Sequence, residues 1–172
     1  MFGMHGIICL ALMLAHTAGV FVQTPSAPDA ISGTWTLDRT TDTRANRPAT
    51  ELVIAISATQ VTIRRHWTSD AGVGEGTSST DTFVRDGRES RMADGRTGAA
   101  TIEAGALTLM LTLTRVSTSP LQPPGEYRTV TREIYRASGN RLSVERTIFG
   151  VRPGEAPGRG PVALLVYTKP TP

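Results

Sequence analysis

His66 is the side chain with the most obvious chemical potential in this chain of 172 residues. Asp70 and Asp81 follow it in the sequence, and residues 78–80 supply hydroxyl groups, so the components of a Ser-His-Asp triad can be counted. A hydrolase of this kind also needs an exposed nucleophile, as in the motif Gly-Xaa-Ser-Xaa-Gly, and the sequence has no such motif. His66 falls on the polar face of a predicted strand, near its end. We therefore expect a solvated histidine and a protein that is not an enzyme.

Two arginines, Arg64 and Arg128, have two possible roles. Each could face a cavity and bind an anionic head group, because a guanidinium presents a planar fork of donors that fits a carboxylate. Each could instead lie on an outer polar face and pair there with a carboxylate such as Glu51 or Glu145. The sequence alone leaves both roles open.

Glu133 and Tyr135 are two residues apart, so in a strand they share one face with Tyr127. They could be the polar groups of an otherwise apolar cavity. Glu103, Glu133 and Glu145 fall on three different predicted strands, and their spacing does not indicate a close pair of carboxylates. The sequence therefore does not support a glycosidase.

Metal and disulfide chemistry are excluded by counting residues. Cys9 is the only cysteine, and the three histidines are His5, His16 and His66. Only His66 lies outside the N-terminal segment that we expect to be removed. The remaining chain then has no disulfide and too few ligands for a zinc site, so we predict no metal and no cofactor.

Residues 1–22 have the pattern of a secretory signal peptide. An apolar run at 6–15 is followed by small residues at 17–19, which suit cleavage by a signal peptidase. The run is well short of the roughly 20 residues that a membrane-spanning helix needs, although an uncleaved anchor is the alternative. We expect a secreted or periplasmic protein that meets the membrane only through this transient segment. Residues 23–31, which include Pro25 and Pro28, are expected to form a flexible linker.

The charge distribution argues against a nucleic-acid partner. The formal net charge is +3, the basic residues are spread along the chain, and aromatic residues make up 5% of the sequence. A nucleic-acid-binding face needs clustered basic residues with interleaved aromatic residues.

The rest of the chain, residues 32–170, alternates between short β-type segments and turns. Leu107, Leu109, Leu111 and Leu113, for example, occupy every second position and form one apolar strand face. Segments rich in Gly and Pro, or the dipeptide Asp-Gly, separate the strands. Ten strands are predicted: 34–38, 52–57, 61–67, 79–85, 88–92, 97–103, 106–116, 127–137, 141–149 and 161–168.

The connections between these strands alternate in length. Those after the first, third, seventh and ninth strands are long, and those after the second, fourth, sixth and eighth are tight. In an up-and-down meander, alternate connections lie at the same end, and a last strand antiparallel to the first can close the sheet. We therefore predict an all-β fold, a single antiparallel up-and-down β-barrel of about 8–10 strands. A β-sandwich would explain the strand count but not the alternation.

A ligand site is expected at the mouth formed by the long loops. Trp67 and Phe149 each end a predicted strand just before a long loop, and Tyr127 begins a strand just after one. Tyr135 lies deeper on the same strand as Tyr127. These four aromatic residues are the candidate ligand-binding residues.

The segment Ser32-Gly33-Thr34-Trp35-Thr36-Leu37-Asp38 resembles the first strand of lipocalins and related calycin barrels, which carries Gly-Xaa-Trp. Together with the ending 165–169, it is similar to lipocalin-like secreted proteins of bacteria. The resemblance implies that Trp35 fills the closed end of the barrel as a structural residue with Gly33. It also implies that a basic side chain from a late strand lies over the tryptophan, and Arg146 or Lys169 could supply it.

Two functions fit these observations. The first is a secreted or periplasmic lipocalin-like protein that binds a small apolar or amphipathic ligand in the barrel. The second is a structural or protein-interaction module that has a barrel filled by its own side chains. The volume of the cavity distinguishes the two.

Overall fold

The computed structural model describes residues 27–38, 48–68, 76–117, 124–152 and 162–170. The predicted signal segment 1–22 and the long connections 39–47, 69–75, 118–123 and 153–161 lie outside these ranges. Within them, the chain contains one short helix and ten strands: α1 (Ala27–Ile31), β1 (Gly33–Leu37), β2 (Glu51–Ile56), β3 (Gln60–Trp67), β4 (Thr77–Val84), β5 (Ser90–Arg91), β6 (Thr97–Glu103), β7 (Ala106–Ser117), β8 (Gly125–Ser138), β9 (Arg141–Val151) and β10 (Val162–Thr168). No helix in these ranges is long and apolar enough to cross a membrane.

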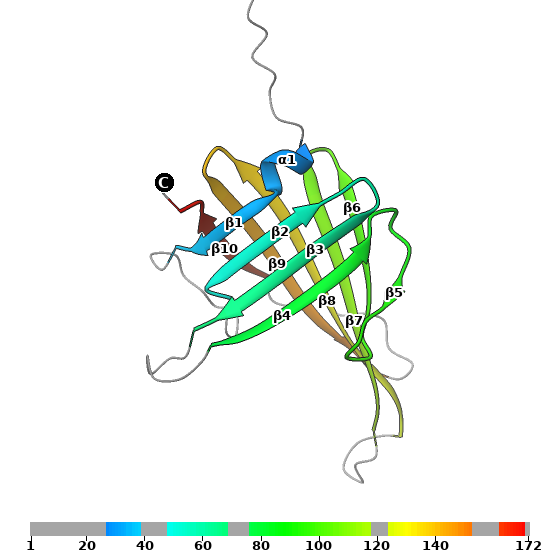
Figure 1. Ribbon diagram of the computed structural model, residues 1–172. Helices are drawn as coiled ribbons and strands as arrows, with labels where there is room; N and C mark the ends of the chain where they lie inside the picture. Colours follow the sequence, from blue (N-terminus) through cyan, green and yellow to red (C-terminus); the bar gives the residue numbers. More distant parts are fainter. Residues whose placement is uncertain (1–26, 39–47, 69–75, 118–123, 153–161, 171–172) are drawn as a thin grey trace, which may run out of the picture.

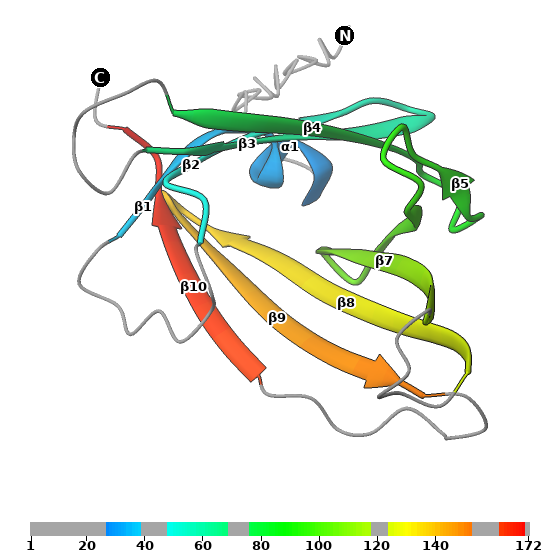
Figure 2. The same ribbon diagram turned by 90° about the horizontal axis from the view of Figure 1, so that it is seen from below.

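The ten strands form one antiparallel sheet that curls into a nearly closed barrel (Figure 1). The strand order is β4-β3-β2-β1-β10-β9-β8-β7-β6-β5. The last strand pairs with the first, with Thr36 opposite Thr168 and Leu37 opposite Tyr167. Figure 2 shows β1–β4 on one side of the barrel and β7–β10 on the other. The predicted all-β, up-and-down barrel is therefore confirmed, and the sandwich alternative is wrong.

The strands form where apolar residues recur at every second position. Leu107, Leu109 and Leu111 of β7 are buried, and the residues between them, Thr108 and Met110, are only partly buried. Val61 and Ile63 of β3 are buried in the same alternating way. Because a strand points successive side chains to opposite faces, one face of each strand fills the barrel and the other faces outward.

The helix α1 closes the barrel at the end where β1 begins. It contacts β2, β7 and β8 and lies between the two sides of the barrel (Figure 2). The predicted flexible linker 23–31 is thus corrected at its C-terminal end, where residues 27–31 are helical. Ile31 is fully buried. The helix has a single turn and no amphipathic repeat, so burial of Ile31, and not helix propensity, accounts for it.

Trp35 is fully buried next to this helix. Its indole Nε1 donates a hydrogen bond of 2.9 Å to the carbonyl oxygen of Ile31. Nζ of Lys169 lies 4.8 Å from the centre of the indole ring, so Lys169, and not Arg146, is the basic residue over the tryptophan. Gly33 has a φ of 130°, a conformation that side chains rarely adopt, which explains a glycine two positions before Trp35.

The barrel has one seam, because β4 and β5 follow one another in the chain but are not hydrogen-bonded neighbours. β5 has only two residues, so most of β4 and β6 face each other across this seam without a strand ladder. The backbone N–H of Gly87 donates to the carbonyl of Ala100 at 3.0 Å. Side chains provide the other described links across the seam.

Gly98 of β6 marks the tightest packing at the seam. A Cβ atom there would lie 2.7 Å from Cε1 of Phe83 and 2.5 Å from Cε of Met92. Met92 can move, but the Phe83 ring is fully buried. We therefore expect Gly98→Ala to lower the free energy of unfolding by about 1–3 kcal/mol in denaturant titrations.

Gly150 provides a matched control for that substitution. It also lies in a strand, and a Cβ atom there would have no neighbour within 4 Å. Gly150→Ala should change the free energy of unfolding by less than about 0.5 kcal/mol. Equal effects of the two substitutions would contradict the close packing across the seam.

Candidate functional site

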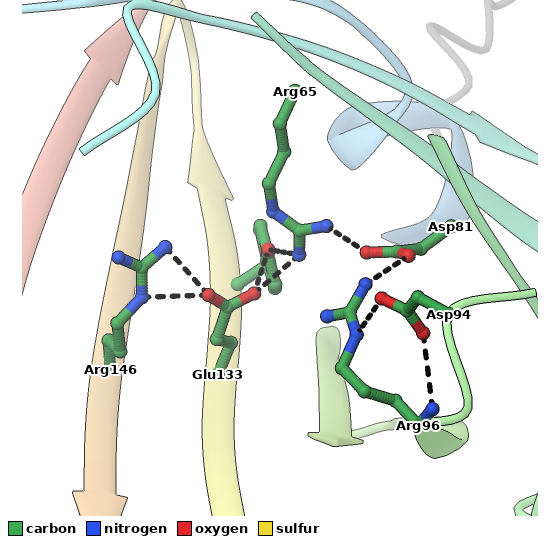
Figure 3. Close-up of polar contacts among 7 residues, drawn as sticks. Arg65, Asp81, Asp94, Arg96, Glu133 and Arg146 are labelled. Atoms are coloured by element: carbon green, nitrogen blue, oxygen red, sulfur yellow. Dashed lines mark hydrogen bonds and ion pairs between the residues drawn. The ribbon is translucent and has the colours of Figure 1, made fainter. Parts of the chain in front are cut away.

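Five ionisable side chains and one tyrosine gather inside the barrel (Figure 3). We call this group the charged layer. Its members come from β3, β4, β8, β9 and the turn before β6, and they are Arg65, Asp81, Arg96, Glu133, Tyr135 and Arg146.

Arg65 lies at the centre of the layer. It shares the inward face of β3 with Val61 and Ile63, and it is itself buried. Nη1 of Arg65 lies 2.6 Å from Oδ2 of Asp81, and Nη2 lies 2.8 Å from Oε2 of Glu133. One guanidinium thus connects β4 to β8 through the inside of the barrel.

Glu133 is the most deeply buried charged residue among the described ones. Its Oε2 accepts hydrogen bonds from the Tyr135 hydroxyl and from Arg65. Its Oε1 accepts from Nε of Arg146 at 2.8 Å and lies 2.7 Å from Nη2 of the same residue. Both oxygens of the carboxylate therefore face guanidinium groups.

These contacts shift the pKa values of the layer. Burial favours the neutral form of Glu133, but the charges of Arg65 and Arg146 outweigh it and lower the pKa of this carboxyl to about 2. Burial, reinforced by the charge of Glu133, raises the pKa of Tyr135. Burial favours the neutral form of Arg65, but the charges of its neighbours dominate and its pKa is raised. At neutral pH Glu133 is therefore ionised, Arg65 carries its positive charge and Tyr135 keeps its hydroxyl proton.

The charged layer also crosses the seam of the barrel. Nη2 of Arg96, just before β6, lies 2.8 Å from Oδ1 of Asp81 on β4. Arg96 also pairs with Asp94, which is half exposed at the turn between β5 and β6. The ion pairs therefore connect the two strands that the ladder leaves apart.

On the α1 side of this layer, the barrel is filled by its own side chains. Leu107, Leu142, Val144 and Leu165 are all at most 1% exposed. Among the described residues, no buried side-chain nitrogen or oxygen lacks a hydrogen-bond partner. A ligand placed here would have to displace packed side chains.

On the opposite side, the inward faces of β7, β8 and β9 continue past the layer and become accessible. Ile148 follows Arg146 by two residues on β9 and is 40% exposed. Its cross-strand partner is Thr131, which in turn pairs with Leu111 of β7. Leu113, two residues further along β7, is partly buried. We call Leu113, Thr131 and Ile148 the mouth wall.

The four predicted ligand-binding aromatic residues have different positions. Trp67 lies on the inward face of β3 and packs against the core, and Tyr127 shares the inward face of β8 with Glu133. Tyr135 belongs to the charged layer. Phe149 lies on the face of β9 opposite to Val144, and thus on the outside of the barrel. The prediction placed Phe149 by its position at a strand end and did not consider which face it occupies.

The two arginines first considered for anion binding are also on the outer face. Arg64 and Arg128 are exposed, and Arg128 pairs with Glu126 at 2.9 Å. Two other arginines lie inside the barrel. They are Arg65, which follows Arg64 in the sequence, and Arg146 of β9. The alternation of β3 could have identified Arg65, because it falls in the apolar register of Val61 and Ile63.

His66 lies near the exposed end of β3, on its outward face. Its Nδ1 is 2.9 Å from Oγ of Ser78 on the adjacent strand. Asp81 points to the inside of the barrel, where it binds Arg65 and Arg96, and Asp70 lies outside the described residues. The described residues therefore do not form a triad around His66.

No group of three or more His, Cys, Asp or Glu side chains within the described ranges could hold a metal ion. No protein-family model matches the chain, and comparisons with curated proteins and with solved structures gave no match either. The architecture itself, a nearly closed antiparallel barrel of ten strands, is compatible with a lipocalin-like fold.

Proposed function

We propose that this chain is a lipocalin-like binding protein that takes a small amphipathic molecule at the mouth of its barrel. The observation that carries the proposal is the mouth wall. Ile148 is a large aliphatic side chain on the inward face of β9, yet it is 40% exposed. An accessible apolar surface on the inward face of a barrel is a typical place for a small-molecule site.

The charged layer sets the depth of the proposed site. Packed side chains fill the interior on the α1 side of the layer. The ligand would therefore lie on the other side, between the layer and the ends of β7, β8 and β9 that are farther from α1. Arg146 is 14% exposed and thus borders both regions. The site therefore has an ionic floor and an apolar wall, which suits a molecule with one polar end.

Export and the lipocalin relationship are part of the same proposal. The apolar segment at 6–15 and the small residues after it support secretion or transfer to the periplasm. The arrangement of Gly33, Trp35 and Lys169 at the closed end supports a lipocalin-like barrel. In this proposal the protein acts by binding and performs no catalytic step.

The test is a titration with N-phenyl-1-naphthylamine, an uncharged probe that becomes fluorescent in apolar surroundings. We expect saturable binding of one probe per chain. Ile148→Ser should weaken it by about 10-fold, since the contact between the probe and one aliphatic side chain is lost. Leu164→Ser is the matched control, because Leu164 is 55% exposed but lies on the outward face of β10.

The alternative function is a module that has a filled barrel and acts through protein contacts. The charged layer favours it, because each buried side-chain nitrogen and oxygen of the described residues has a hydrogen-bond partner, and such a layer can stabilise the barrel without any ligand. Absence of saturable probe binding would support this alternative. Equal losses in Ile148→Ser and Leu164→Ser would place the site away from the mouth wall.

A further inference from the structure

We infer that the free edge of β4 is an interaction surface, where a second copy of this chain binds by pairing its own β4 with it. The inference goes beyond the proposed function, because it does not depend on a ligand. It rests on the backbone groups at the edge of β4, on the side chains along that edge and on the protection of the opposite edge of the sheet.

One edge of β4 has no strand paired with it. The backbone N–H of Arg85, just after β4, donates to the carbonyl of Thr59 at 2.9 Å, and hydrogen-bonded pairs recur at every second position of an antiparallel ladder. The odd-numbered residues of β4 therefore bond to β3. The backbone groups of Ser78, Thr80 and Thr82 point the other way, and among the described residues they have no backbone partner across the seam. In both views β4 begins on the side of the barrel away from β5 (Figures 1 and 2).

The side chains along this edge do not oppose the addition of a strand. Natural proteins protect a free edge with charged side chains, with proline or by keeping the strand very short. β4 has eight residues and no proline, lysine or arginine. Its single charged residue, Asp81, points into the barrel and pairs with Arg65 and Arg96. The edge therefore belongs to a full-length strand whose outward side chains are all neutral.

The opposite edge of the sheet is protected, and this difference selects the partner. β5 has only two residues, and exposed charged residues lie in it or just before it, namely Arg88, Glu89 and Arg91. Pairing of β4 with β5 of another copy would also leave a free edge at each end and build an open filament. Pairing of β4 with β4 is two-fold symmetric and is complete with two copies.

The two-fold axis falls at Thr80. The middle of β4 lies between Thr80 and Asp81, so an axis at either residue gives nearly full overlap. An axis at Asp81 would place two carboxylates opposite each other, which is unfavourable, whereas an axis at Thr80 places Asp81 opposite Ser79. Thr80 then pairs with its own copy and Ser78 with Thr82, and hydroxyl pairs of this kind stabilise neighbouring strands. About six backbone hydrogen bonds join the two copies.

Sedimentation equilibrium tests this pairing. A single added strand makes a small interface, and small interfaces are weak, so we expect a reversible dimer with a dissociation constant of about 10–100 µM. Thr80→Lys should weaken the dimer by at least about 10-fold, because two ammonium groups then lie opposite each other. Thr80→Glu should have the same effect through two carboxylates. An equal mixture of the two variants should associate at least as tightly as the wild type, because opposite charges then meet.

Thr147→Lys is the matched control. Thr147 lies on the outer face of β9, opposite Arg132 of β8, as Thr80 lies opposite Arg64 of β3. β9 has a paired strand on both sides, so this substitution should leave the dissociation constant unchanged. Far-ultraviolet circular dichroism of each variant shows whether the barrel is folded.

Hydrogen exchange locates the contact between the copies. The amides of Ser78, Thr80 and Thr82 should exchange more slowly as the protein concentration rises, because only the dimer gives them a partner. Absence of a dimer up to about 1 mM would overturn the inference, as would a dimer in which these amides gain no protection. Equal weakening by Thr80→Lys and Thr147→Lys would also overturn it. None of these results depends on binding of N-phenyl-1-naphthylamine, so the proposed function stands or fails separately.

Discussion

Replacing Trp35 with alanine is expected to lower the free energy of unfolding by about 3–5 kcal/mol, the usual cost of truncating a large buried aromatic side chain. The indole ring is fully buried at the end that α1 closes. Its loss also removes the hydrogen bond to Ile31 and the contact with Lys169. Denaturant titration followed by far-ultraviolet circular dichroism measures the change. A decrease below about 1 kcal/mol would mean that Trp35 does not organise the closed end.

A second substitution separates the parts of this effect. Trp35→Phe keeps an aromatic ring but removes the Nε1–H that donates to the Ile31 carbonyl. Because a buried carbonyl would lose its partner, we expect an intermediate loss of about 1–3 kcal/mol. The order wild type, Trp35→Phe, Trp35→Ala in decreasing stability would indicate that packing and hydrogen bonding both contribute.

The strands and their order could be predicted because each strand has a local signal. In β7, leucines at every second position specify which face is buried before any partner strand is known. The alternation of loop lengths then specified an up-and-down order, and the pairing of β1 with β10 follows from it. These features depend on neighbouring residues in the sequence and on simple connectivity.

The helix α1 and the seam have no such signal. Residues 27–31 form a single turn whose stability comes from the burial of Ile31 in the assembled barrel. The seam depends on the length of β5, which has two residues where the sequence predicted five. Both features are decided by tertiary packing, so a strand-by-strand analysis does not find them.

The candidate site was predictable in part for the same reason. The sequence placed Glu133 and Tyr135 on one strand face, where they could be the polar groups of a cavity, and in the structure they lie inside the barrel in hydrogen-bond contact. Their partners Arg65 and Arg146 come from other strands, so identifying them requires the cross-strand register. The sequence analysis instead considered Arg64, which is adjacent to Arg65 and therefore on the opposite face.

Glu133→Gln is expected to lower the free energy of unfolding at pH 7 by about 3–5 kcal/mol, because removing one partner of a buried ion pair leaves uncompensated charge. Glutamine keeps the shape of the side chain but leaves Arg65 and Arg146 without their shared carboxylate. Glu126→Gln is the control. Glu126 also pairs with an arginine, but both side chains of that pair are exposed, so the expected loss is below about 1 kcal/mol.

The pH dependence of the same variant identifies the charge of Glu133 as the cause. The pKa of Glu133 is lowered from 4.5 to about 2 on folding, so its ionisation stabilises the folded protein fully above pH 4.5. This stabilisation, about 3 kcal/mol, is lost as the pH falls from 4.5 towards 2. The difference in stability between the wild-type protein and Glu133→Gln should therefore decrease over this interval, when both are titrated with denaturant at a series of pH values. A difference that stays constant from pH 7 to pH 2 would mean that the shape of the side chain, and not its ion pairs with Arg65 and Arg146, stabilises the barrel.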